Sequence, residues 1–233
     1  MSEIALPQGK TIDPQTMTGA SFARLGLTHE VIERVFELVE AEDARLASPD
    51  FDKLHRGNNR WGHCLAALRR ELKRHDWTWD TDPQGMRLIV SPDGEIQLSV
   101  AAASELGSGE KGPRPSTHPK GKYTQLAVCE NAQLFLPGVE VPSLPHIADE
   151  SALTWLLLHE RRFSKETMKV EYLYEVSLPI GLSGDGVRQR VHKWGPQLLQ
   201  GRVTFDAKIE EVPQEDRFDA GEDEDVPTIE IRA

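Results

Sequence analysis

The spacing of apolar residues in this 233-residue chain changes once, near residue 75, and that change limits the folds it can adopt. Between residues 28 and 74 apolar side chains recur every three or four positions, as in a helix with one buried face. From residue 86 onward they alternate in short runs separated by turn-forming residues, which is typical of strands. The sequence therefore predicts an α+β fold in which two N-terminal helices precede a mainly antiparallel sheet of about six strands.

The first helix is predicted at residues 28–47, with Thr28 as its N-cap. Leu27 and Ile32 have the spacing of a hydrophobic staple around that cap. The second helix is predicted at residues 59–74, where four apolar residues fall on one face. They are Trp61, Leu65, Leu68 and Leu72.

The clearest strands are residues 86–90 and 95–100, joined by a turn at residues 91–94 in which Gly94 suits a positive φ. The apolar run 152–159 is too short for its period to separate helix from strand. We assign it as a strand because it can pair antiparallel with residues 170–178. The other strands are predicted at residues 123–128 with a continuation at 131–136, 187–194 and 201–205, with a turn at 181–186 before the last two.

Charge is spread unevenly along the chain. The formal net charge is −11, but residues 210–233 hold ten acidic residues and two arginines, and so carry −8 of it. We predict an extended or partly docked arm at residues 1–26, a single α+β domain at 27–209 and a disordered acidic tail at 210–233. The tail would be a solvating end, an internal competitor for polyanions, or a docking segment that adds a strand to a partner's sheet.

Composition limits the cellular setting. The chain has no apolar run of the length that crosses a membrane, and its N-terminus lacks the basic and then apolar pattern of a secretory signal. Cys64 and Cys129 cannot form a disulfide framework, and we interpret them as free thiols. We therefore expect a cytoplasmic protein that does not bind membranes.

The strongest basic cluster lies in and just before the second helix. Between His55 and His75 six basic residues face one acid, Glu71, for a net charge of +5. A face of this kind suits nucleic-acid phosphates and gives salt-sensitive affinity with little sequence preference. The alternative is a solvated outer face. The basic residues are Arg56, Arg60, Arg69, Arg70, Lys73 and Arg74.

A second basic segment is the glycine- and proline-rich stretch at residues 107–122. Its basic side chains, with nearby hydroxyls and backbone N–H groups, would hold a phosphate, and a disordered loop is the alternative. The segment lacks the P-loop pattern, and we expect no helix to begin after it. The basic residues are Lys111, Arg114, Lys120 and Lys122.

Trp77 and Trp79 follow the basic helix. In an extended segment two residues at this spacing share a face, where they could stack on single-stranded bases. Packing in the core or at a sheet edge is the alternative.

Three carboxylates near the first hairpin raise the alternative of a metal-dependent nuclease or phosphoesterase. Asp93, Glu95 and Glu105 would hold a Mg²⁺ ion that activates the attacking water. The lysine of the usual (D/E)-x-K pattern is missing, because Gln97 stands where that lysine would be. The histidines and cysteines do not have zinc-ligand spacing, and we interpret Cys64 as a core residue.

Taken together, these patterns predict a non-catalytic binding or accessory protein that needs no cofactor. Nucleic acid is the ligand class we expect, bound by the basic helix and the basic loop and tuned by the acidic tail. A protein–protein interaction module that uses the tail and an exposed sheet edge remains the second alternative.

Overall fold

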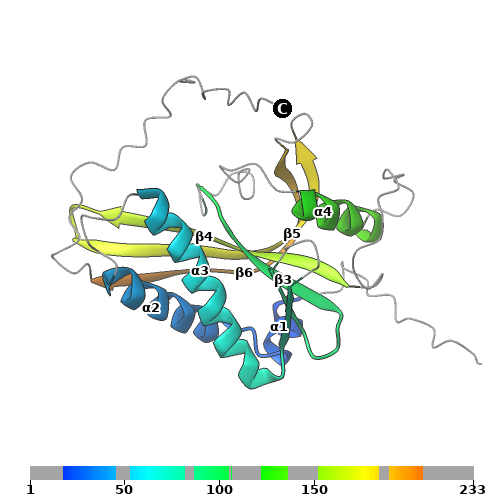
Figure 1. Cartoon of the computed structure of the whole chain (residues 1–233), viewed down its shortest axis with the longest axis horizontal. Coiled ribbons are helices and arrows are strands. Elements are labelled where there is room, and N and C mark those ends of the chain that lie inside the picture. The colour runs from blue at the N-terminus through cyan, green and yellow to red at the C-terminus, as the bar shows by residue number, and fades with distance from the viewer. Residues whose placement is uncertain are drawn as a thin grey trace, which may run out of the picture.

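The computed structural model describes residues 18–45, 53–81, 87–104, 106, 122–135, 152–183 and 189–206. Within these residues it has four α-helices and a six-stranded sheet that is mostly antiparallel, which confirms the predicted α+β class (Figure 1). The helices are α1 (Gly19–Arg24), α2 (His29–Arg45), α3 (Lys53–Leu72) and α4 (Lys122–Phe135), and the 3-10 turn η1 (Lys73–His75) follows α3. The strands are β1 (Thr78–Thr81), β2 (Arg87–Val90), β3 (Ile96–Ala102), β4 (Leu153–Ser164), β5 (Lys169–Ser183) and β6 (Arg190–Asp206).

The strands lie in the sheet in chain order, from β1 at one edge to β6 at the other. Neighbouring strands are antiparallel except β3 and β4, which run parallel with Leu98 opposite Trp155. Parallel neighbours need a crossover connection, and α4 lies within it.

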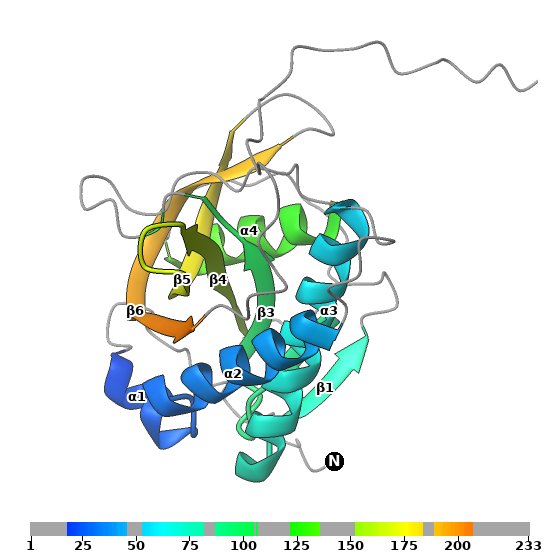
Figure 2. The same ribbon diagram turned by 90° about the vertical axis from the view of Figure 1, so that its left-hand side faces the viewer.

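Helices cover both faces of the sheet. Alternate residues of β4 divide between two apolar clusters: Trp155 and Leu157 pack with α2 and α3, whereas Leu156 and Leu158 belong to a smaller cluster. The two views place α4 on the opposite side of the sheet from α2 (Figures 1 and 2). The larger core therefore lies between α2, α3 and one face of the sheet.

The start of α2 agrees with its sequence. The hydroxyl Oγ1 of Thr28 accepts a hydrogen bond from the Val31 backbone N–H at 3.4 Å, as an N-cap does. Leu27 and Ile32, the predicted staple pair, are fully buried. The helix predicted at residues 28–47 is thus confirmed over His29–Arg45, and its last two predicted residues lie outside the described ranges.

The second predicted helix is also present, and α3 begins earlier than its period suggested. Leu65, Leu68 and Leu72 are buried, and Cys64 is buried beside them, as expected of a core residue. Burial raises the pKa of the Cys64 thiol to about 12.

The turn between β2 and β3 forms where it was predicted. The Gly94 backbone N–H donates to the carbonyl of Ser91 at 2.9 Å, and Gly94 has a φ of +74°. A positive φ suits glycine because other residues have a Cβ that strains the local backbone there, although the space around Gly94 itself is open.

The strands predicted at residues 123–128 and 131–136 are wrong, because this segment is α4. The expectation that no helix follows the basic loop is wrong for the same reason. Leu126, Val128, Asn131 and Ala132 are buried, a spacing that fits a helical face as well as a strand. The parallel pairing of β3 and β4 decides between them, since it requires a crossover of this kind.

Three other boundaries differ from the predictions. Within the predicted arm, residues 19–24 form α1, and Phe22 is fully buried. The two strands predicted at residues 187–194 and 201–205 are one continuous strand, β6, which accommodates its irregular middle through shifts in register against β5. The turn predicted at 181–186 starts later, because β5 continues to Ser183. An additional strand, β1, forms at the sheet edge.

Several predictions fall outside the described residues. They are the basic loop with Lys111, Arg114 and Lys120, the carboxylate Glu105, and the acidic tail at 210–233. None of the described helices combines the length and the apolar character that a membrane crossing demands.

Candidate nucleic-acid interface

Two arginines of the predicted basic set form ion pairs with buried acids. Arg60 Nε donates to Asp43 Oδ2 of α2 at 2.6 Å. Arg74 Nη1 and Arg34 Nε both donate to Glu71 Oε2 at 3.0 Å. The positive charge of Arg60 is therefore neutralised within the protein, whereas exposed Arg74 shares the single charge of Glu71 with Arg34, so α3 is somewhat less basic outward than its sequence indicates.

The other end of the basic helix is arranged differently. Arg69, near the C-terminus of α3, places its guanidinium carbon 5.9 Å from the centre of the Trp79 ring on β1. Lys73 of η1, one helical turn further on, places its ammonium nitrogen 5.8 Å from the same ring. Both are cation–π contacts, which combine a positive charge with an aromatic face.

Arg87, at the start of β2, extends this group and was not among the residues predicted from sequence. Its guanidinium carbon lies 5.5 Å from the centre of the Trp61 ring. The indole N–H of Trp61 donates to the carbonyl of Val100 at 2.9 Å, which holds that ring against β3. The sequence could not indicate Arg87, because the pairing of β1 with β2, in which Trp79 lies opposite Ile89, is known only from the structure. We call Trp61, Arg69, Lys73, Trp79 and Arg87 the cation–tryptophan surface.

Arg69 is the most unusual member of this surface. Its Nε and Nη2 atoms are buried and have no hydrogen-bond partner among the described residues. Burial lowers the pKa of Arg69, and the positive charge of Arg87 lowers it further. Among the described residues no carboxylate forms an ion pair with Arg69, Lys73 or Arg87. Within the described part of the chain, these three cations therefore form a concentration of positive charge without a paired carboxylate.

The two tryptophans considered for base stacking have different environments. Trp77 is buried at 2% exposure, and its indole N–H donates to the carbonyl of Leu25 at 2.6 Å. Trp79 is 45% exposed. Core packing, the alternative to base stacking, therefore holds for Trp77, whereas Trp79 is open to solvent. The two rings do not present one shared face to a ligand.

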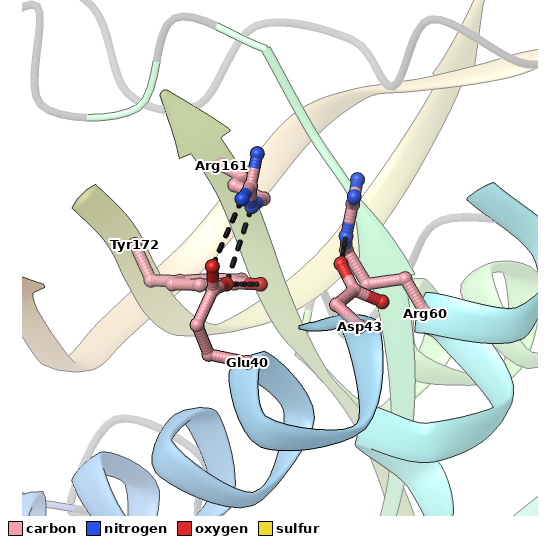
Figure 3. A network of polar contacts seen from close by, with 5 residues as sticks. All are labelled: Glu40, Asp43, Arg60, Arg161 and Tyr172. Atoms are coloured by element: carbon pink, nitrogen blue, oxygen red, sulfur yellow. Dashed lines mark hydrogen bonds and ion pairs between the residues drawn. The ribbon is translucent and has the colours of Figure 1, made fainter. Parts of the chain in front are cut away.

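A second group of arginines and aromatic rings lies between α2, α3 and the β4–β5 hairpin (Figure 3). Glu40 of α2 accepts hydrogen bonds from Arg161 Nη2 at 2.9 Å and from the Tyr172 hydroxyl at 2.8 Å. The Arg60–Asp43 ion pair lies beside it (Figure 3). We call these five residues the paired cluster, because each of its guanidinium groups contacts a carboxylate. This arrangement connects α2 to the sheet.

A separate buried carboxylate lies on β5. The Ser177 hydroxyl donates to Glu175 Oε1, and both side chains are buried. Burial raises the pKa of Glu175, whereas hydrogen bonds from Ser177 and Gln197 oppose that shift. The sequence did not indicate that Glu175 and Ser177 form a buried pair, since both are polar residues within a strand that also carries exposed positions.

The carboxylates of the nuclease alternative do not form a described metal site. Asp93 Oδ1 accepts hydrogen bonds from the Ser91 hydroxyl at 2.5 Å and from the Glu95 backbone N–H at 3.1 Å, so it helps to shape the turn. Within the described ranges, no group of three or more histidine, cysteine, aspartate or glutamate residues is placed to hold a metal ion.

The remaining basic residues are only partly located. Arg70 is exposed on α3, next to Arg69 in the chain. Arg56 lies in the first turns of α3 and Lys122 opens α4, but their side chains are outside the described part of the structure. Of the predicted set, the structure thus brings Arg69 and Lys73 together on one surface.

Comparison of the chain with protein-family models, with curated proteins and with solved structures finds no match.

Proposed function

We propose that this protein is a non-catalytic nucleic-acid-binding or accessory protein that contacts its ligand through the cation–tryptophan surface. The observation that carries the proposal is that the three cations of the cation–tryptophan surface have no ion-paired carboxylate among the described residues. Positive charges that lie close together repel one another, so an external anion would be attracted to this surface.

The chemistry of the surface supports a phosphate ligand. Arginine donors form paired hydrogen bonds with phosphate oxygens, and lysine adds a flexible point charge. Arg69, Lys73 and Arg87 supply both kinds of group, and exposed Arg70 adds a further charge at the same end of α3. Phosphate contacts of this kind provide affinity without reading a sequence.

A binding titration tests the proposal. Full-length protein is titrated into a labelled oligonucleotide at several salt concentrations, beside the variant Arg69→Glu with Arg70→Glu. We expect weaker binding by the variant for all sequences alike, with the salt slope reduced by about 1.4, because each phosphate contact on a single strand contributes about 0.7.

The matched control reverses two charges elsewhere. Lys165 and Lys169 are exposed at the turn between β4 and β5, away from the end of α3. The variant Lys165→Glu with Lys169→Glu has the same change in net charge, and we expect much less loss of affinity. Equal losses in the two double variants would show that net charge alone controls binding, and the proposed surface would be wrong.

The acidic C-terminal segment is the proposed modulator. Its ten acidic residues would compete with nucleic acid for the basic surface, so removal of residues 210–233 is expected to tighten binding at low salt. If the truncated protein binds no more tightly than the full chain, the tail has no such role.

Adding Mg²⁺ to the same titration tests the nuclease alternative. Cleavage products that disappear in Asp93→Ala, while that variant keeps its melting temperature, would overturn the non-catalytic proposal. Failure of the full chain and the truncation to bind any oligonucleotide would instead favour a protein partner.

A further inference from the structure

We infer that the cation–tryptophan surface recognises single-stranded nucleic acid, with one unpaired base stacked on Trp79 and an adjoining phosphate held by Arg69 and Arg87. The inference rests on the proposed function and adds the form of nucleic acid and the role of each side chain.

Trp79 has the exposure that a stacking residue needs. It is 45% exposed, and among the large hydrophobic residues described only it and Met168 are exposed. It lies on β1, the edge strand of the sheet, and no other described strand pairs with the outer side of β1. An indole in this position offers area to a planar base, and stacking on such rings occurs with any base.

The indole is also held in place before any ligand binds. Arg69 and Lys73 contact the same ring from consecutive turns of one helical segment, at 5.9 and 5.8 Å. Because the ring is already positioned, stacking would cost less conformational entropy than it would for an unrestrained side chain. When a base stacks on the Trp79 ring, Arg69 and Lys73 would lie close to the phosphate that joins this nucleotide to the next.

Arg69 and Arg87 provide the phosphate contact. Both guanidinium groups lie against tryptophan rings of the surface, and they are near enough for the charge of Arg87 to lower the pKa of Arg69. A phosphate beside them would reduce the repulsion between the two guanidinium groups. It would contact the solvent-exposed parts of these side chains, since Nε and Nη2 of Arg69 are buried.

The shape of the ligand follows from the role of Trp79. A strand that stacks a base on this ring and reaches Arg69 and Arg87 would pass over the end of α3 and the β1–β2 edge. Such contacts suit single strands, since a duplex keeps its bases stacked on one another and cannot present a base face to Trp79.

The test separates base stacking from phosphate contact. Full-length protein, Trp79→Ala and Trp79→Phe are titrated with labelled oligothymidylate, with an abasic oligomer of equal length and with a duplex. We expect Trp79→Ala to lower affinity for oligothymidylate by about five- to a hundredfold, because a stacked base contributes about 1–3 kcal/mol. Trp79→Phe should retain most of the affinity, and the abasic oligomer should bind the parent protein and Trp79→Ala equally.

The possible results distinguish this inference from the proposed function. Unchanged oligothymidylate affinity in Trp79→Ala, together with a loss in Arg69→Glu with Arg70→Glu, would overturn stacking and leave phosphate binding intact. Unchanged affinity in both variants would remove the surface altogether. Duplex binding as tight as single-strand binding would also overturn the inference. Thermal melting of Trp79→Ala checks that the exposed position tolerates the change.

Discussion

The paired cluster and the cation–tryptophan surface both contain arginines and aromatic rings, but their arginines have different partners. In the paired cluster, Arg60 and Arg161 each contact a carboxylate of α2. On the cation–tryptophan surface, Arg69 and Arg87 contact tryptophan rings and no described carboxylate. Since α3 contributes an arginine to each group, position along one helix does not tell whether an arginine serves the fold or remains available to a ligand.

The difference follows from the neighbours of α3. Toward its first half, α3 lies beside the acidic C-terminal part of α2, where Asp43 receives Arg60. Toward its end it meets β1 and β2, where Trp79 and Arg87 lie. Ion pairs fix a geometry and stabilise the fold, whereas an uncompensated cation lowers stability slightly and keeps its affinity for anions.

The largest expected effect on stability comes from breaking the paired cluster. Arg161→Gln leaves Glu40 without its guanidinium partner in a site where both side chains are mostly buried, at 19% and 14% exposure. We expect the free energy of unfolding to fall by about 2–3 kcal/mol, measured by denaturant titration. The double variant Glu40→Gln with Arg161→Gln should recover part of this loss. A change below about 0.5 kcal/mol would place the ion pair among weak surface contacts.

Tyr172→Phe should have a smaller effect in the same cluster. The change removes the hydroxyl that donates to Glu40 at 2.8 Å but keeps the ring, which stacks on Phe36 at 4.7 Å. We expect a loss of about 1 kcal/mol in the same denaturant experiment. A loss as large as that of Arg161→Gln would mean that the hydroxyl, rather than the ion pair, holds α2 to the sheet.

Arg69→Gln tests the same comparison on the cation–tryptophan surface. Because Arg69 has no ion-paired carboxylate among the described residues and lies near Arg87, its neutralisation should leave stability within about 0.5 kcal/mol of the parent or raise it. The same variant should bind oligonucleotide more weakly. Destabilisation comparable with that of Arg161→Gln would show that Arg69 is structural and would contradict its assignment to the ligand.

The smallest expected effect is a difference in alkaline stability. Burial raises the pKa of Tyr172, and the charge of Glu40 raises it further, so the folded state keeps the proton to a higher pH than the unfolded chain. The unfolded state ionises first, and the free energy of unfolding should therefore fall as the pH rises above about 10. In Tyr172→Phe this decline should be shallower. Equal slopes in parent and variant would mean that Tyr172 titrates as it does in water.

Local features of the fold could be predicted because their causes are local. The cap at Thr28, the turn at Gly94 and the buried stripe of α3 depend on neighbours within a few residues, and all three form as predicted. The α4 segment shows where this reasoning stops. Its apolar residues fit either period, and only the parallel pairing of β3 with β4, which needs a crossover connection of the kind that is usually helical, favours a helix there.

The same division applies to the candidate interface. The sequence by itself determined that basic residues gather on the second helix and that Trp79 follows them. It did not determine which arginines are paired with carboxylates, because Asp43 and Glu71 act through packing between helices. Nor did it determine that Arg87 of β2 contacts Trp61 of α3 at the surface. Those relations connect residues distant in the chain, and only the tertiary structure, which sets the distances between them, decided them.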